Sequence, residues 1–190
     1  MANNAPRRSL LKGCAVLYFA ATTAWPAYAK DDWQSIAPGT VVLFRHATAP
    51  GGSDPAGFQL EDCRTQRNLS TEGRVQASAI GNACRQRNIA VTTVWSSQWC
   101  RTRDTADRAF PGLRIDQPAF NSFFANYSRE SPQTQAALDL LALWKGQDVL
   151  VVFTHQVNIT ALTGIVPESG EGVVVALSGR ELKVLGRIKP

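Results

Sequence analysis

The sequence predicts an α/β fold of three layers, in which a mostly parallel sheet is flanked by helices and followed by a C-terminal β-hairpin. Two apolar, β-branched runs, residues 40–44 and 149–154, have the length and composition of strands buried on both faces. Segments with helical spacing separate the predicted strands, as in α/β proteins. Each run also leads into one of the two histidines of the chain, His46 and His155.

The first predicted strand ends in Arg45 and His46 and is followed by a polar loop over residues 47–69 that is rich in proline and glycine. Ligands of open α/β sheets bind beyond the carboxyl ends of the strands. Because His155 ends a strand in the same way, we expect the two histidines to lie at one edge of the sheet, with Arg45 beside them.

A helix is predicted after this loop, with Ser70 as its N-cap and Arg87 near its end. Apolar side chains at Val75, Ala79 and Ala83 are spaced by four residues and predict its buried stripe. The remaining predicted elements are a strand over residues 89–95, a helix over about 99–110, a helix capped by Ser131 that stops at Gly146, a short helix over 157–163 that Gly164 ends, and hairpin strands over 173–177 and 181–188.

Residues 118–129 are aromatic-rich and carry no regular pattern. Two interpretations are open for them. They can form a packed cover over the core, or they can form a wall of a substrate site. The aromatic residues concerned are Phe120, Phe123, Phe124 and Tyr127.

Composition is that of one ordinary globular domain, with 190 residues and 18% charged residues. The net charge of +5 is partly due to residues 1–29, and the rest of the chain carries 17 basic and 15 acidic residues. Nucleic-acid binding normally needs a concentrated basic face. The composition therefore does not indicate a nucleic-acid partner.

Residues 1–29 are predicted to be a signal peptide. Basic residues precede an apolar run over residues 14–24, and residues 27–29 form an A-x-A cleavage site. The pair Arg7 and Arg8 resembles a twin-arginine export signal, and an ordinary secretory signal is the alternative. The apolar run is too short for a comfortable membrane span. Residues 30–190 are then a single domain that is periplasmic or secreted in a bacterium, without stable membrane insertion.

Four motifs appear in order along the chain: Arg45-His46, residues 68–73, residues 96–106 and Thr154-His155. Together they resemble the histidine phosphatase superfamily, which has the phosphoglycerate-mutase-like fold. The resemblance implies that His46 is the nucleophile and forms a phosphohistidine. It also implies that Arg45, Arg101 and His155 hold the phosphoryl group.

These residue types suit the chemistry. Phosphoryl transfer requires positioning and positive charge around the phosphoryl oxygens. Arginine provides two parallel donors and a permanent charge, and an imidazole is a nucleophile once neutral. Arg101 would begin a helix, whose first N–H groups and dipole would add to the anion site. No metal or other cofactor is required.

The sequence departs from the family pattern at three positions. Ala47 replaces the usual glycine after the first histidine, Gln156 replaces an acid after the second, and Asn121 stands where a glutamate is expected. The proton donor for the leaving group is therefore unknown. The loop carboxylates that can be considered for this role are Asp54, Glu61, Asp62 and Glu130.

Two further polar residues, Gln156 and Asn158, can either cap a helix locally or contact the substrate. Arg103 is two residues past Arg101, so it projects to another side of the helix and is expected at the surface. The site histidines lack carboxylate or thiolate partners at ligand spacing, which argues against a metal site.

Three cysteines remain after the signal peptide, and three pairings are possible. Cys63 and Cys100 both lie near the proposed site, and Cys84 shares a helix face with Ile80. We expect a disulfide between Cys63 and Cys100 and a buried thiol at Cys84.

These observations predict an exported phosphatase that hydrolyses small-molecule or envelope phosphomonoesters. Sugar phosphates of the cell envelope are one candidate substrate. The alternative is a protein of the same fold that binds a phosphate ligand without turnover.

Overall fold

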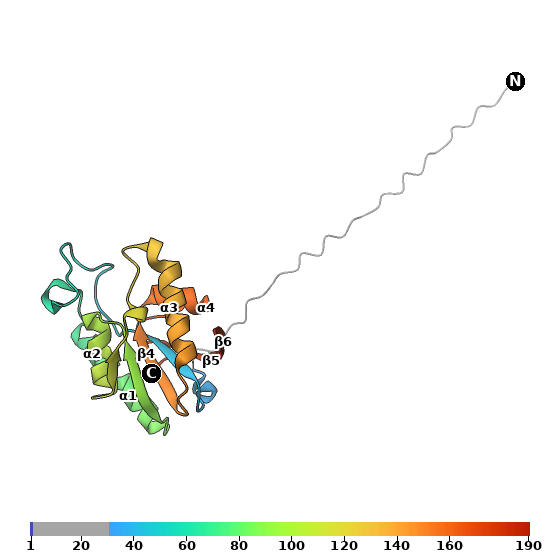
Figure 1. The fold of residues 1–190 in the computed structure, drawn as a ribbon, viewed down its shortest axis with the longest axis horizontal. Helices are drawn as coiled ribbons and strands as arrows, with labels where there is room; N and C mark the ends of the chain where they lie inside the picture. Colours follow the sequence, from blue (N-terminus) through green and yellow to red (C-terminus); the bar gives the residue numbers. More distant parts are fainter. Residues whose placement is uncertain (2–30) are drawn as a thin grey trace.

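The computed structural model describes Met1 and residues 31–190 (Figure 1). The predicted signal peptide and its cleavage site therefore lie outside the described residues. Residues 31–190 form one sheet of six strands in the order β3-β2-β4-β1-β5-β6. The strands are β1 (Val41–Arg45), β2 (Val91–Ser96), β3 (Arg114–Asp116), β4 (Val149–Thr154), β5 (Gly172–Ser178) and β6 (Glu181–Ile188).

Helices cover both faces of the sheet, which confirms the predicted three-layer α/β architecture (Figure 1). Helices α1 and α2 pack on one face, and α3 and α4 pack on the other. The helices are α1 (Thr71–Gln86), α2 (Cys100–Ala109), α3 (Glu130–Leu143) and α4 (Gln156–Thr163), with short 3-10 helices at Trp33–Ser35, Cys63–Thr65, Pro118–Phe120 and Tyr127–Arg129. In the part of the chain described, no helix has the length and apolarity needed to cross a membrane.

Strands β3, β2, β4 and β1 are parallel, and β5 and β6 add an antiparallel hairpin beside β1. The register pairs Arg45 with Thr154 at the carboxyl ends of β1 and β4. The N–H of His46 donates to the carbonyl of Thr154 over 3.0 Å, which extends this pairing by one residue. The two histidines are therefore brought to one edge of the sheet, as predicted.

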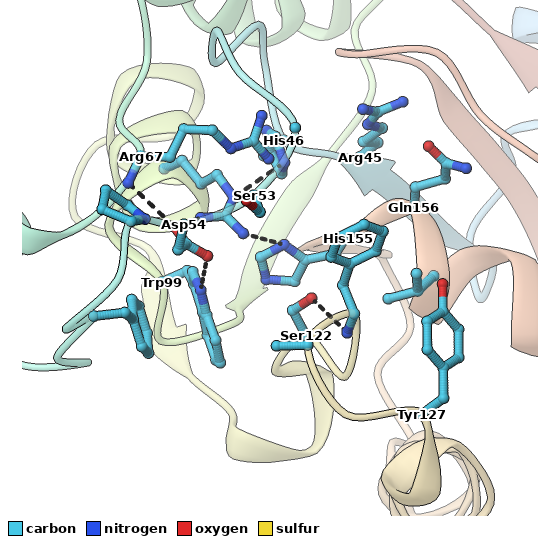
Figure 2. Close-up of a pocket in the computed structure, with 17 residues that line it drawn as sticks. Arg45, His46, Ser53, Asp54, Arg67, Trp99, Ser122, Tyr127, His155 and Gln156 are labelled. Atoms are coloured by element: carbon cyan, nitrogen blue, oxygen red, sulfur yellow. Dashed lines mark hydrogen bonds and ion pairs between the residues drawn. The ribbon is translucent and has the colours of Figure 1, made fainter.

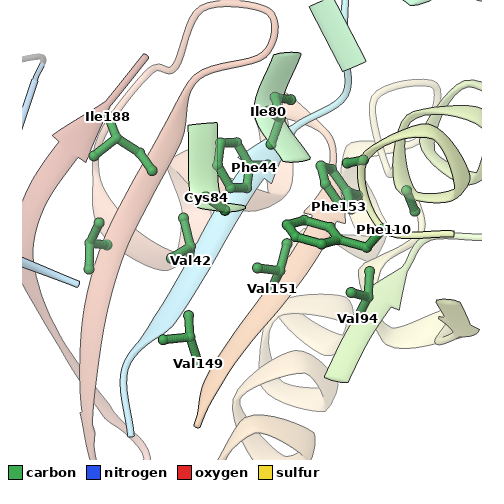
Figure 3. Packing of buried hydrophobic residues seen from close by; sticks show 13 residues of the cluster. Val42, Phe44, Ile80, Cys84, Val94, Phe110, Val149, Val151, Phe153 and Ile188 are labelled. Carbon is green, nitrogen blue, oxygen red and sulfur yellow. The ribbon is translucent and has the colours of Figure 1, made fainter. Parts of the chain in front are cut away.

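Alternating side chains of the buried strands build two hydrophobic layers. Phe44 and Phe153 stack at 5.5 Å between ring centroids, on the face where α1 contributes Ile80 and Cys84 (Figure 3). Leu43 and Val152 point to the opposite face. Every residue of β4 is buried, which is the reason for its continuous apolar sequence.

The buried face of α1 agrees with the predicted one at Ala83 but differs from it at Val75. Val75 is 68% exposed, and the buried stripe runs through Gly73, Ala77, Ile80 and Cys84. Gly73 belongs to this stripe because a Cβ there would lie 2.0 Å from the Thr48 carbonyl oxygen. The close approach of α1 to the loop after β1 thus selects small residues, which carry little hydrophobic signal in the sequence.

Two other elements differ in detail. Helix α3 begins at Glu130, one residue before the predicted cap Ser131, and its buried residues include Ala137 and Leu141. Strand β3 was not predicted, because its three residues combine two charged side chains with a half-exposed isoleucine. Ser70 caps α1 as predicted, with its side chain accepting from the Gly73 N–H.

The cysteines and the aromatic segment can now be placed. Cys63 and Cys100 form a disulfide, and Cys84 is a buried free thiol, so the predicted pairing is confirmed. In the segment over residues 118–129, Phe120 and Phe123 are buried, whereas the other two aromatic residues are about half exposed. Phe120 and Phe123 therefore fit the packed cover, and a substrate-site wall stays a prediction for Phe124 and Tyr127.

Candidate active site

His46 is buried at the end of β1 and has a defined tautomer. Its Nδ1 lies 2.7 Å from the carbonyl oxygen of Ala47, so Nδ1 must carry the proton. Its Nε2 accepts a hydrogen bond of 3.2 Å from Nε of Arg101. Burial, together with the positive charge of Arg101, lowers the pKa of His46 well below its usual value. His46 is therefore neutral near pH 7 and presents a lone pair on Nε2.

His155 lies beside it, with 5.5 Å between the ring centroids. Its Nδ1 accepts from Arg101 at 3.4 Å, and its Nε2 donates to the hydroxyl of Ser97 at 2.8 Å. Ser97 in turn donates to the side-chain oxygen of Asn121. Burial and the charge of Arg101 also lower the pKa of His155 well below its usual value. The ring is thus held by a chain of polar side chains from the β2 end.

Arg101, in the first turn of α2, joins the two histidines. Its guanidinium donates to His46 through Nε, to His155 through Nη2, and to Asp54 through Nη1 at 2.7 Å. Burial lowers its pKa to about 10, which leaves it charged at neutral pH. The helix N–H groups contribute less than expected, because the Cys100 N–H donates to Gln66 and the Thr102 N–H donates to the Trp99 carbonyl.

Arg45 completes the predicted set from the other side of His46 (Figure 2). Its Nη1 donates to the carbonyl of Pro167 at 3.0 Å. Its Nε is buried and makes no hydrogen bond within the described residues. The four predicted site residues therefore line one cavity of about 290 Å³.

Two charged residues of the loop over residues 47–69 also reach this cavity (Figure 2). Arg67 was not predicted. Its Nη1 is anchored by the carbonyls of Ala49 and Gly51 at 2.6 and 2.8 Å, and its Nε is buried and unbonded within the described residues. It lies close enough to help lower the pKa of both histidines. No local pattern marks Arg67, since its position depends on how the loop folds back.

Asp54 is the other charged loop residue. One oxygen accepts from Arg101 and from the Arg67 N–H, and the other accepts from the indole of Trp99 at 3.0 Å. Burial alone would raise the pKa of Asp54, but the charge of Arg101 and these hydrogen bonds hold it below its usual value. Asp54 is therefore an ionised partner of Arg101.

The other candidate proton donors lie elsewhere. Glu61, Asp62 and Glu130 are not among the residues that line the cavity, and Asp62 pairs with Arg64. Of the four carboxylates that were considered, the structure brings only Asp54 to the site.

Of the remaining polar residues that the sequence singled out, some line the cavity and others support the surrounding structure. Gln156 lines the cavity, whereas the Asn158 amide donates to the carbonyl of Asn121 at 2.9 Å and supports that loop. Arg103 lies outside the cavity and pairs with Asp116 at 2.7 Å, so it is partly buried rather than free at the surface. Within the described residues, no group of three or more histidine, cysteine, aspartate or glutamate side chains is arranged to hold a metal.

The fold is similar to that of several phosphatases of known structure. A mycobacterial glucosyl-3-phosphoglycerate phosphatase has a TM-score of 0.58 at 14% identity, over 81% of this chain and 100% of the other. The SixA protein from Agrobacterium tumefaciens has a TM-score of 0.56 at 20% identity, over 81% and 99%. Phosphoserine phosphatase from Entamoeba histolytica has a TM-score of 0.55 at 12% identity, over 78% and 95%. At these identities, the similarity shows the α/β fold.

A comparison of the sequence with family models adds independent evidence. The family model of the histidine phosphatase superfamily (branch 1) matches residues 41–118, which include Arg45, His46 and Arg101. No curated protein matches the chain in sequence. The family model and the similar folds together support a relationship to the histidine phosphatase superfamily, which the chain matches in sequence over residues 41–118.

Proposed function

We propose that this protein is an exported phosphatase that hydrolyses phosphomonoesters through a phosphohistidine on His46. The observation that carries the proposal is the state of His46. Its Nδ1–H is fixed on the Ala47 carbonyl, and its Nε2 faces the guanidinium of Arg101. A neutral imidazole is suited to attack a bound phosphoryl group once the Arg101 donor turns from its Nε2 lone pair to the phosphate, and the positive charge of Arg101 stays beside it.

The arginines would bind the phosphoryl oxygens. Arg45 and Arg67 each keep a buried Nε that makes no hydrogen bond in the described part of the chain, and both line the cavity. Arg101 donates to both histidines, and these two donors would turn to phosphate oxygens when the substrate enters. His155 would contact the same group from the β4 end. Arg67 thus adds a third arginine to the two that the sequence predicted.

The reaction has two displacements. His46 Nε2 attacks phosphorus, and the bond to the ester oxygen breaks with its electron pair on that oxygen, which takes a proton from water to become an alcohol. A second water then attacks phosphorus and gives its proton to the hydroxide that the first step left, while the phosphorus–nitrogen bond breaks and its electron pair returns to Nε2. The sum consumes one water and releases an alcohol and inorganic phosphate.

Asp54 would orient Arg101 rather than protonate the leaving group. Its carboxylate accepts hydrogen bonds from Arg101, Arg67 and Trp99, all of which favour the ionised form. The pair with Arg101 keeps one edge of the guanidinium occupied. The remaining donors then face the two histidines.

Export is the second part of the proposal. The signal-like residues 1–29 motivate it, and the disulfide between Cys63 and Cys100 fits an oxidising compartment. The N-terminus of the exported protein is expected at Lys30 or within a few residues of it. Finding Met1 on protein from the exported fraction would contradict this. Envelope sugar phosphates are a proposed substrate class for a periplasmic or secreted enzyme.

Activity is tested with a panel of phosphomonoesters on the purified protein, with vanadate as inhibitor. We expect phosphate release that vanadate suppresses. If the protein binds inorganic phosphate but releases none from any ester, the alternative of a phosphate-ligand binding protein without turnover is correct.

A further inference from the structure

Aromatic side chains stand on two sides of the cavity (Figure 2). They lie beyond the charged cluster, by which we mean Arg45, His46, Arg67, Arg101 and His155. On one side, Phe58 stacks on Trp99 with 5.2 Å between centroids and 17° between planes. Trp99 also meets His155 edge-on at 5.4 Å, so this wall begins directly at the charged cluster. On the other side, Phe124 and Tyr127 contact each other at 6.3 Å.

The second wall is not part of the buried core, although Tyr127 meets the buried ring of Phe123 edge-on at 6.0 Å. Phe124 is 50% exposed and Tyr127 is 57% exposed, whereas Phe120 and Phe123 of the same segment are buried. The latter two pack the segment against the protein. Exposing two large apolar side chains is unfavourable in water, and here both also line the cavity.

The geometry of phosphoryl transfer connects the walls with the leaving group. The nucleophile and the leaving oxygen lie roughly in line through phosphorus. With His46 buried at the floor, the leaving group must point away from it, toward the mouth of the cavity. The aromatic walls stand there.

We propose that the substrate is a phosphomonoester whose leaving group carries a ring, and that this ring lies between the Phe58–Trp99 wall and the Phe124–Tyr127 wall. This inference rests on the proposed function and adds the class of its substrate. The ring can be aromatic or it can be a sugar, since both offer a flat apolar face to an aromatic side chain. The neighbouring arginines would bind the phosphate, and the two aromatic walls would bind the ring.

The test compares phosphates of primary alcohols, so that the leaving oxygen is chemically matched. Benzyl phosphate and glucose 6-phosphate carry rings, ethyl phosphate carries none, and n-hexyl phosphate offers a flexible apolar chain. We expect kcat/KM for at least one ring substrate to exceed those of the ethyl and n-hexyl esters about tenfold, the scale of one aromatic contact. A preference for benzyl phosphate identifies an aromatic ring, and a preference for glucose 6-phosphate identifies a sugar.

Variants then locate the preference. In the double variant Phe124→Ala and Tyr127→Ala, the ratio of ring to ethyl substrate should fall toward one. Tyr127→Phe keeps the ring of the wall and should keep the ratio. Leu143→Ala removes a comparable exposed apolar side chain outside the cavity and serves as the matched control.

Two results would overturn the inference: equal kcat/KM for ring and chain substrates, or an unchanged ratio in the double variant. A protein that turns over none of these esters would contradict the proposed function instead. The ring is then tested by calorimetry with benzylphosphonate and ethylphosphonate. Tighter binding of the benzyl compound supports the ring site, and equal binding overturns it.

Discussion

The charged cluster at the strand ends and the Phe124–Tyr127 wall differ in burial and in the contacts that hold them in place. His46, His155 and Arg101 are 2–4% exposed, and the register of β1 with β4 fixes the two histidines. Phe124 and Tyr127 are half exposed and lie in the segment that connects β3 to α3. The positions of the two histidines are therefore set by the sheet, whereas the exposed side chains of Phe124 and Tyr127 can change without disturbing the core. This arrangement separates the proposed chemistry from the choice of substrate.

The largest effect is expected inside the cluster. Arg101→Ala removes the donor that joins both histidines and should lower kcat by about 10²–10³, corresponding to about 3–4 kcal/mol. His155→Ala should belong to the same class. Steady-state kinetics checks this, with Arg103→Ala as the control because Arg103 lies two residues away on α2, outside the cavity. If Arg103→Ala lowers kcat as much as Arg101→Ala does, the loss of activity cannot be assigned to the cluster.

The next effect concerns the link between loop and cluster. The disulfide joins Cys63 of the loop to Cys100, the residue before Arg101, across a sequence separation of 37. Replacing both cysteines with serine should lower the free energy of unfolding by about 3–4 kcal/mol, because the unfolded chain gains freedom. Denaturant unfolding measures it. The matched control is Cys84→Ser, which changes a buried free thiol. An intact stability in the double variant would show that the loop is held by its other contacts.

Asp54→Asn tests the contact between the loop and Arg101 more finely. The amide cannot hold the guanidinium as the carboxylate does, so kcat should fall about tenfold, or about 1.4 kcal/mol. Loss of the negative charge should at the same time tighten product inhibition by inorganic phosphate. A merely structural role would weaken phosphate binding instead. A loss confined to substrates with poor leaving groups would identify Asp54 as the proton donor.

The smallest expected effect concerns pH. Both histidines have a folded pKa well below the usual value, so below about pH 6.5 the unfolded chain binds protons that the folded protein does not. Stability is therefore full above that pH and falls as the pH decreases toward the folded values. Each histidine should contribute a loss of about 1 kcal/mol between pH 7.5 and 5.5. His46→Gln should reduce this loss by about half in denaturant titrations, and an unchanged dependence would show that His46 titrates normally.

The sequence predicted the cluster better than the loops for a physical reason. Strands β1 and β4 are buried on both faces, so their apolar runs and their ends at His46 and His155 are visible locally. Arg67 and Asp54 reach the site through contacts made when the loop folds back on α2, and nothing in their neighbourhood in the sequence indicates this. The stripe of α1 was misplaced at Val75 because the close approach of Thr48 selects Gly73, which periodicity does not detect.

The aromatic segment shows the same limit within a few residues. Phe123 and Phe124 are neighbours of one residue type, yet the first is 3% exposed and the second 50%. Only the path of the chain between the 3-10 helices at Pro118–Phe120 and Tyr127–Arg129 decides which of them faces the cavity. The sequence therefore left two interpretations open. The structure buries Phe120 and Phe123 and brings Phe124 and Tyr127 to the cavity, where the substrate wall is our proposal.

The most direct measurement of the central claim is detection of the phosphoenzyme. The protein is mixed with a labelled phosphomonoester, quenched, and mapped by peptide analysis after acid and after alkaline treatment. We predict label on His46 that is lost in acid and survives alkali, and we predict that His46→Ala loses both the label and essentially all turnover. If His46→Ala retains turnover within about tenfold of the wild type, or if the label survives acid on another residue, the phosphohistidine mechanism is contradicted.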